Sequence, residues 1–324
     1  MIVMPVDTIS MGATYPNFIL INGIYAYILG GGKFSIVDIS VSPPKIKSST
    51  QILQYPTKLQ VISPTRIIAV SQYNNILMIF DVSNPELPII VGQITTGSAP
   101  YSVSLSDSKK IAYVINNSSS TMQSFDISNN SNITLLSSVT VGANPVGLYV
   151  LGNIICVSNG YDTIQIFNTN FLLLSTTITQ LYPYNNIIFG NIVYVVCTNV
   201  LSVYDISYPN SPLLIKNITI STPIEMKIFK NYLFIVTGDN IFYIYDIHNP
   251  INPTLIGNAF GQGGSYIKSV SATGNIVCSV DDNLNILKTY SIFYNYSEDN
   301  YGSTKKLLRI TNLSRYLTFN GQKN

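Results

Sequence analysis

The stretch Phe80-Asp81-Val82-Ser83-Asn84-Pro85-Glu86-Leu87-Pro88 decides the fold, because versions of it return along the chain. Close copies are Tyr204-Asp205-Ile206-Ser207-Tyr208-Pro209 and Tyr245-Asp246-Ile247-His248-Asn249-Pro250, and weaker copies surround positions 38, 126, 168 and 291. Successive motif positions, from 38 to 291, are separated by 37 to 45 residues. A regular period of about 42 residues indicates a stacked repeat architecture.

Each period has the same order of segments. An alternating run is followed by a Gly-Asn type turn, a β-branched run, a polar loop, a second run ending on the motif Asp, and a last short run. Four short strands per period predict an antiparallel four-stranded sheet, and seven such sheets close into an all-β, seven-bladed β-propeller. The alternating runs open at Pro16, Pro56, Pro100, Pro145, Pro183 and Pro223, and in the last repeat at Ser265-Tyr266.

The motif Asp residues have a structural explanation. An Asp that ends the third strand can accept backbone N–H bonds from the turn that follows it, and the later prolines keep that turn out of a ladder. We therefore interpret Asp38, Asp81, Asp126, Asp205 and Asp246 as turn caps rather than catalytic acids.

The segment Phe34-Ser35-Ile36-Val37-Asp38-Ile39-Ser40 and its relatives at 79–83, 203–207 and 244–247 resemble the LVIVD-repeat family of β-propellers over roughly residues 13 to 297. Repeat four departs from the pattern with Asn168, and repeat seven with Ser291. The resemblance implies a seven-bladed propeller and says little about activity, because one fold hosts many functions.

Residues 1–300 are predicted to form the propeller. Residues 2–10 resemble the fourth-strand run Gln93–Gly97, so we expect them to supply the outer strand of the last blade. Residues 301–324 form a basic tail with five Lys or Arg and no acidic residue. The tail is expected to pack on the last blade or to dock to an acidic partner.

Composition limits the function classes. Charged residues make up 10 % of the chain, against a usual share of about 25 %, and there are 23 Tyr. A surface so poor in charge suits a protein or glycan partner better than nucleic acid, which requires clustered Lys and Arg. The abundance of Ile, Asn and Tyr suggests an AT-rich source, such as a microbe or a large DNA virus.

The first residues lack a basic region followed by an apolar run, and no apolar stretch approaches the ~18 residues of a membrane span. An intracellular or virion-associated location is therefore expected. The three cysteines lie in strand-like runs and are interpreted as buried thiols, with pairing or metal binding as the alternative. They are Cys156, Cys197 and Cys278.

Catalytic groups are scarce. His248 is the only histidine, and Glu86, Glu225 and Glu298 are the only glutamates. One histidine is incompatible with a multi-histidine metal site, and we interpret His248 as a turn-surface imidazole rather than a triad member, so we predict no metal and no cofactor.

One set of positions is expected to border the central channel, two residues after each opening proline: Phe18, Lys58, Ser102, Gly147, Asn185, Glu225 and Lys268. The positions one further on are mostly apolar and are expected to pack between blades: Ile19, Leu59, Val103, Leu148, Asn186, Met226 and Ser269. An ion pair between Glu225 and Lys268 is expected at the channel mouth, with general acid or base work as the alternative.

Loops that lead into the inner strands and loops that join second to third strands share one face of a propeller. Tyrosine offers large contact area at low entropic cost, so this face is the candidate binding surface. Its expected residues are Tyr15, Tyr55, Tyr73, Tyr101, Tyr161, Tyr182 and Tyr266, with Asp162, Asp239, Asp281 and Asp282.

Two hypotheses remain. The first, which we favour, is a non-enzymatic module that binds a protein or a glycan, such as a structural or surface component of a large DNA virus or AT-rich microbe. The second is a propeller enzyme, a carboxylate-dependent glycosidase or lyase or a metal-dependent hydrolase, that uses channel groups such as Glu225 and Asn185.

Overall fold

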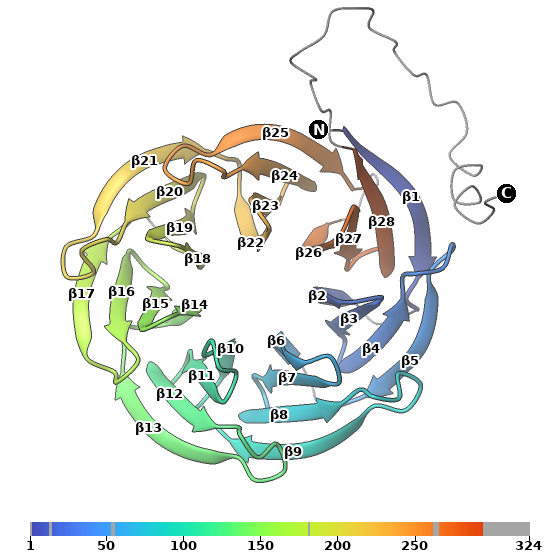
Figure 1. Cartoon of the computed structure of the whole chain (residues 1–324), viewed down its shortest axis with the longest axis horizontal. Helices are drawn as coiled ribbons and strands as arrows, with labels where there is room; N and C mark the ends of the chain where they lie inside the picture. Colours follow the sequence, from blue (N-terminus) through green and yellow to red (C-terminus); the bar gives the residue numbers. More distant parts are fainter. Residues whose placement is uncertain (1, 13–14, 53–55, 181, 262–265, 294–324) are drawn as a thin grey trace, which may run out of the picture.

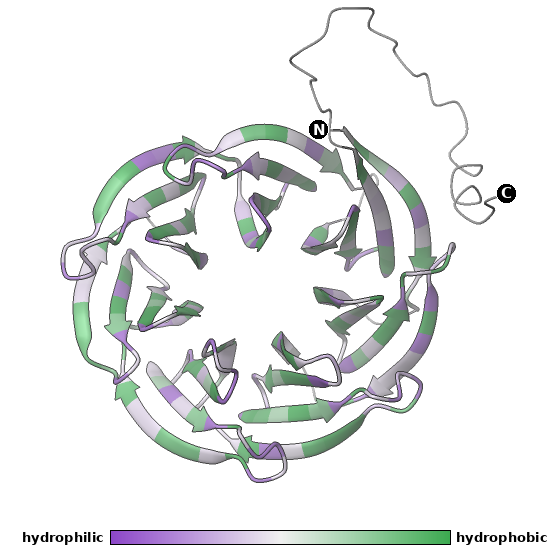
Figure 2. Ribbon diagram, in the orientation of Figure 1, coloured by the Kyte–Doolittle hydropathy of each residue, from purple (hydrophilic) through white to green (hydrophobic). Residues whose placement is uncertain are grey.

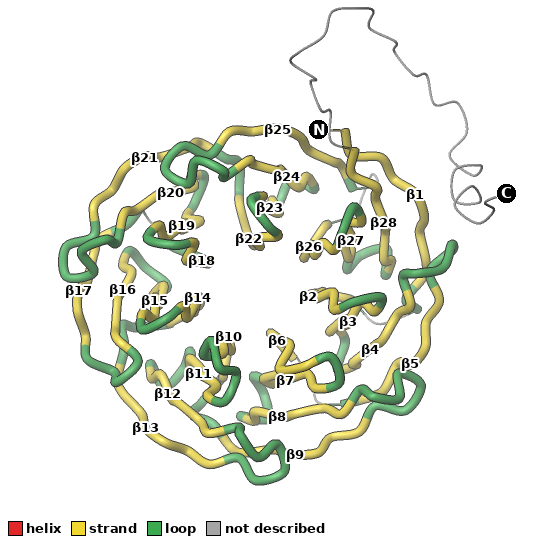
Figure 3. Tube along the Cα trace, viewed as in Figure 1, coloured by secondary structure: helices red, strands yellow, loops and turns green. Residues whose placement is uncertain are grey.

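The computed structural model describes residues 2–12, 15–52, 56–180, 182–261 and 266–293. They form a ring of seven four-stranded antiparallel sheets (Figure 1). The first strand of each sheet lies nearest the centre and the last lies on the outside, and turns connect them (Figure 3). This confirms the predicted seven-bladed propeller. No helix long and apolar enough to span a membrane occurs within the described ranges.

The strands of each blade run from the inner to the outer edge of the sheet. Blades 1 and 2 are β2 (Pro16–Asn22), β3 (Tyr25–Gly30), β4 (Lys33–Asp38) and β5 (Lys45–Gln51), then β6 (Pro56–Ser63), β7 (Arg66–Ser71), β8 (Ile76–Asp81) and β9 (Ile89–Thr95). Blades 3 and 4 are β10 (Pro100–Leu105), β11 (Ile111–Asn116), β12 (Thr121–Asp126) and β13 (Thr134–Thr140), then β14 (Pro145–Leu151), β15 (Ile154–Asn159), β16 (Thr163–Asn168) and β17 (Leu173–Ile178).

Blades 5 and 6 are β18 (Asn185–Phe189), β19 (Ile192–Cys197), β20 (Val200–Asp205) and β21 (Leu213–Thr219), then β22 (Pro223–Phe229), β23 (Tyr232–Thr237), β24 (Ile241–Asp246) and β25 (Thr254–Phe260). Blade 7 is β26 (Ile267–Thr273), β27 (Ile276–Asp281), β28 (Ile286–Phe293) and, outermost, β1 (Ile2–Ser10).

The ring is closed by the start of the chain. β1 pairs antiparallel with β28 from Ile2–Phe293 to Ser10–Ile286, so one blade contains both ends of the propeller. This is the place that the sequence analysis gave to residues 2–10. The tail 301–324 lies outside the described residues.

The hydrophobic core is divided among the blade interfaces, because strands buried on both faces pack against the next sheet. One such interface joins β2–β4 to β6–β8 through Tyr27, Phe34 and Phe80, with the rings of Phe34 and Phe80 stacked 4.6 Å apart. Similar clusters join every neighbouring pair, including blade 7 to blade 1. The three cysteines are buried free thiols within these cores.

The repeated Asp residues cap their turns. Each of the five Asp residues predicted as caps accepts a hydrogen bond from the backbone N–H two residues later, over 2.7 to 2.9 Å. In blade 4 Asn168 takes the same place and accepts from the N–H of Asn170 and Leu172 at 3.0 Å. Replacing Asp by Asn therefore keeps the acceptor that the turn requires.

A β-bulge follows the first residue of most inner strands. In β22, for example, the pairing jumps from Pro223 to Glu225, and in β26 it jumps from Ile267 to Ser269. Because a bulge reverses the alternation of side chains, it fixes which residues of an inner strand are equivalent between blades. Ser269, and not Lys268, is therefore the counterpart of Glu225 in blade 7.

Candidate functional site

The upper face of the ring consists of the loops that lead into the inner strands and the loops that join second to third strands. The residue just before the opening proline has a positive φ at every such position that the structure describes: Tyr15, Ala99, Asn144, Tyr182 and Thr222, at 40° to 55°. Asn tolerates this left-handed conformation, whereas a bulky aromatic residue is strained in it. Tyr15 and Tyr182 thus occupy positions for which their side chains are poorly suited.

Asparagines of the neighbouring loops hold these residues in place. Asn285 Oδ1 accepts the N–H of Tyr15 at 2.7 Å, and Asn75 Oδ1 accepts the N–H of Ala99 at 2.8 Å. Asn199 does the same for Thr222 at 3.1 Å. Each bond joins the second-to-third-strand loop of one blade to the loop that follows that blade, so these bonds tie neighbouring loops of the upper face together.

Tyrosine side chains project from this ring. Tyr15, Tyr73, Tyr161, Tyr182 and Tyr266 are between 47 % and 64 % exposed. Tyr161 and Tyr182 belong to adjoining loops, because the N–H of Tyr182 donates to the carbonyl of Tyr161 at 2.6 Å. The structure thus brings two of the predicted tyrosines together between blades 4 and 5.

One of the predicted tyrosines does not join this surface as expected. Tyr101 lies within β10 at the bulge that follows Pro100, and its side chain is half-buried, so the prediction of a loop tyrosine there was wrong. The strand begins at Pro100, as the opening proline predicts, so Tyr101 belongs to the strand and not to the loop before it. Tyr55 lies outside the described residues.

Lys268 also differs from the prediction. Its position at the bulge of β26 directs its ammonium to Asp282, with the nitrogen 3.1 Å from the carboxylate, and over the ring of Tyr266. The predicted Glu225–Lys268 pair is therefore wrong. Lys268 and Asp282 belong to the loop surface beside Tyr266, while Glu225 points to the axis of the ring.

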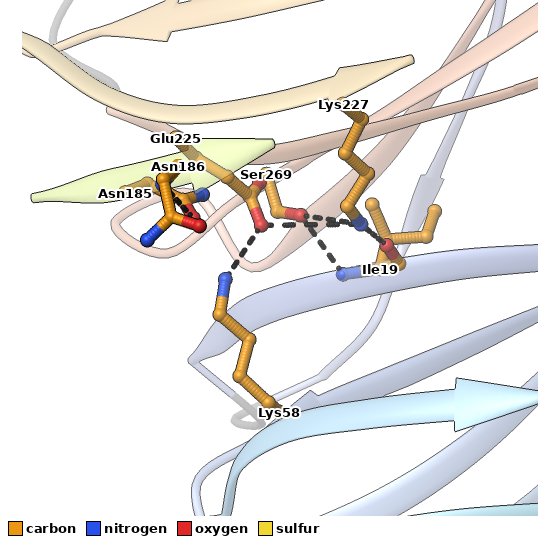
Figure 4. Close-up of polar contacts among 7 residues, drawn as sticks. All are labelled: Ile19, Lys58, Asn185, Asn186, Glu225, Lys227 and Ser269. Atoms are coloured by element: carbon orange, nitrogen blue, oxygen red, sulfur yellow. Dashed lines mark hydrogen bonds and ion pairs between the residues drawn. The ribbon is translucent and has the colours of Figure 1, made fainter. Parts of the chain in front are cut away.

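An ion pair crosses that axis. Glu225 Oε1, on β22 of blade 6, lies 3.0 Å from Lys58 Nζ, on β6 of blade 2, and 3.9 Å from Lys227 Nζ. Figure 4 shows the two lysines reaching the carboxylate from different sides. Both ammonium groups also cover the ring of Phe18, at 4.6 and 3.9 Å from its centroid, and Lys227 donates to the carbonyl of Ile19. The centre therefore connects blades 1, 2 and 6.

Burial and charge act against each other at this centre. Burial alone would raise the pKa of Glu225, but the charges of Lys227 and Lys58 outweigh it and hold the pKa below its ordinary value. Burial lowers the pKa of Lys227 to about 8, although Glu225 opposes the shift. Near neutral pH the carboxylate is therefore ionised, and it lies beside two lysines.

The channel cavity beside this ion pair is small, about 160 Å³, and is lined by Phe18, Lys58, Ser102, Asn185 and Glu225 among others. Residues of the second predicted set are buried, with Ile19, Leu59 and Met226 at 1 % exposure or less. The described residues contain no cluster of three or more His, Cys, Asp or Glu that could hold a metal ion. Glu225 is the one carboxylate in the cavity lining, and two cations already occupy it.

A profile of the LVIVD repeat matches residues 17–50, 68–96, 187–219 and 225–259. The chain is a β-propeller that contains LVIVD repeats. The matches fall on blades 1, 2, 5 and 6, whose motif Asp residues cap the turns described above. No curated protein matches the sequence.

Solved structures share the fold of this LVIVD-repeat propeller. A computationally designed protein, Ika8, matches 89 % of this chain and all of its own length, with 15 % identity and a TM-score of 0.66. A functionally unknown protein from Desulfotomaculum acetoxidans matches 83 % of this chain and 93 % of its own, with 14 % identity and a TM-score of 0.69. At such identities the likeness shows the fold alone.

Some residues of the site were not predicted from the sequence. Lys227 follows Glu225 by two positions on one strand, so the period-2 alternation of β22 was a usable signal for it. Tyr184 is 43 % exposed beside Tyr182 and was equally visible as a tyrosine near an opening proline. The loop residues Asn75, Asn199 and Asn285 were not distinguishable among the many Asn of the chain, because their partners are 23 to 270 residues away.

Proposed function

We propose that this LVIVD-repeat propeller is a non-enzymatic binding module that holds a protein or glycan partner on its upper face. The observation that carries the proposal is the pair Tyr15 and Tyr182, exposed aromatic side chains kept in a left-handed backbone conformation. Backbone strain that stability alone would remove is typical of binding surfaces. A role as a structural or surface component, suggested by composition, is compatible with such a module.

The chemistry of the upper face suits a partner that is bound through aromatic contact area and uncharged hydrogen bonds. Tyr161, Tyr182 and Tyr184 lie on loops that a backbone hydrogen bond joins, and each side chain is at least 43 % exposed. Such aromatic groups are common at the centres of interfaces and at sugar-binding surfaces. Since Lys268 is already paired with Asp282, binding is expected to depend weakly on salt.

The arrangement of the channel favours this function over the enzymatic alternative. Glycoside hydrolysis commonly uses two carboxylates about 5 to 9.5 Å apart, one of which carries a proton. The described cavity offers Glu225 alone, with a lowered pKa and two ammonium partners. Such a carboxylate has no proton to donate at neutral pH, and its Oε1 already lies beside two ammonium groups.

The test compares capture by the full chain and by variants, using a glycan array and affinity purification from the native source. Replacing Tyr161, Tyr182 and Tyr266 together by Ser should weaken capture at least tenfold, or about 1.4 kcal/mol, with the fold intact. Tyr208→Ser is the matched control, because this side chain is 80 % exposed on the opposite face. Equal capture by the triple variant, or its loss in the control, would refute the proposal.

A further inference from the structure

The channel cavity is a second place where this chain could hold a ligand, separate from the tyrosines of the upper face. Its volume is about 160 Å³, and every residue that lines it lies on one of the inner strands β2, β6, β10, β14, β18 and β22. These strands mix hydrophilic and hydrophobic residues around the channel (Figure 2). Because no loop of the upper face lines the cavity, a ligand held in it does not depend on the function proposed for that face.

Residues at one register position define the chemistry of this cavity. Each inner strand has a residue that pairs with the penultimate residue of its second strand. In chain order these residues are Phe18, Lys58, Ser102, Gly147, Asn185, Glu225 and Ser269. Lys58, Ser102, Asn185 and Glu225 all line the cavity, so polar groups from blades 2, 3, 5 and 6 meet at one level of the channel.

Positive charge exceeds negative charge in the lining. Its charged residues are Lys58, Glu225 and Lys227, and both lysines lie beside the same carboxylate oxygen, Glu225 Oε1. The other oxygen, Oε2, is buried. Burial, and then the charge of Lys58, lower the pKa of Lys227 to about 8 against the effect of Glu225. Below that pH the cavity therefore has a surplus of positive charge, which an anionic ligand would balance.

Hydrogen-bond donors are also in surplus. An ammonium has three N–H groups, and the only acceptor of the Lys58 ammonium among the described residues is Glu225 Oε1. Asn185 Oδ1 accepts the N–H of Asn186 at 2.9 Å, whereas the amide nitrogen of Asn185 has no acceptor within the described ranges. Ser102 adds a hydroxyl group to the lining. Several donors beside a surplus cation suit the two oxygens of a carboxylate.

The rest of the lining limits the size and charge of the ligand. Leu20, Leu148 and Tyr149 supply apolar surface, and a cavity of about 160 Å³ suits a small molecule, since one water occupies about 30 Å³. A phosphate monoester would bring nearly two negative charges, more than the surplus of one lysine. We propose that the channel cavity binds a small monocarboxylate, whose oxygens accept hydrogen bonds from Lys58 and Asn185.

Saturation-transfer NMR of the full chain tests the proposal with three probes, acetate, lactate and benzoate, each compared with its neutral amide. At least one carboxylate should bind with a dissociation constant below about 10 mM and at least tenfold more tightly than its amide. Lys58→Met and Asn185→Asp should each weaken that binding at least tenfold. Asn185→Asp keeps the acceptor of the Asn186 N–H but brings a negative charge to the cavity, so it should fold like the wild type.

Lys110→Met is the matched control, since Lys110 is exposed in the turn between β10 and β11 on the lower face, opposite the tyrosines. It should bind the carboxylate like the wild type, and circular dichroism should show equal folding of the control and Asn185→Asp. Equal affinity for each carboxylate and its amide, or no binding of any of the three carboxylates, would overturn the proposal. So would binding that survives Asn185→Asp, or that Lys110→Met weakens as much as Lys58→Met does.

Discussion

At the scale of single residues, some side chains stabilise the fold, and others occupy backbone conformations that they do not favour. The motif Asp residues maintain it: the Ser two positions later holds the pKa of Asp81, Asp126 and Asp205 below the ordinary value by hydrogen bonding. Tyr15 and Tyr182 are tolerated, because the ring of loop asparagines and prolines fixes a backbone conformation that Tyr does not favour.

The cap role of Asp126 is tested by two substitutions. Asp126→Ala removes the acceptor of the Ser128 N–H and should lower the melting temperature by several degrees, whereas Asp126→Asn should keep most of the stability, as Asn168 does in blade 4. The pKa of Asp126 is lowered from 3.8 in the folded protein. The stability that this carboxylate contributes is therefore present above that pH and is lost as the pH falls through the lowered pKa. Equal melting temperatures for both variants would contradict a cap.

Tyr182→Asn tests whether the aromatic residue is kept at the expense of stability. Asn tolerates a φ of 55°, so the variant should be more stable than the wild type by about 1 kcal/mol in chemical denaturation, while partner capture weakens. A variant that is less stable than the wild type would show that the Tyr182 side chain supports the fold.

At the scale of elements, the outer strand β1 has the largest effect on the whole ring. Deleting residues 1–10 would remove the partner of β28 and expose a long apolar edge in blade 7. We expect aggregation or a large fall in melting temperature, measured by light scattering and calorimetry, whereas removal of 301–324 should cost much less. The opposite ranking of the two truncations would mean that the ring is closed by the C-terminal segment.

Elements also show where sequence reasoning was sufficient. The turn caps were predictable because donor and acceptor are two residues apart, and the strands because each period repeats the same turn signals. The last repeat lacks its opening proline, so nothing in the sequence indicated that Ile267 takes that position, and Lys268 was placed one residue out of register. The Lys58–Glu225 pair joins residues 167 apart, and no local pattern reveals a contact across the ring axis.

At the scale of the whole molecule, Lys227 in the charged centre with Glu225 and Lys58 adds a pH-dependent contribution to stability. Lys227 has a pKa of about 8 in the folded protein against 10.5 in the unfolded one, so the unfolded chain binds more protons between these values. Stability from this group therefore rises with pH across that window. Glu225 and Lys58 face Lys227, and their charges contribute to its shift.

A Lys227→Met variant isolates this effect. As the pH rises from 8 to 10.5, the free energy of unfolding of the wild type should increase relative to that of the variant by about 3 kcal/mol at most. Urea denaturation of both proteins over this range measures it. A difference that does not change with pH would show that burial does not lower the pKa of Lys227.

Hydrogen exchange with and without the captured partner measures whether the upper face binds it. We expect slower exchange in the loops around Tyr161 and Tyr182–Tyr184, with no change in the turn from Asp205 to Pro212 on the lower face. Protection confined to that turn and its equivalents, with the tyrosine loops exchanging as in the free protein, would contradict binding on the upper face.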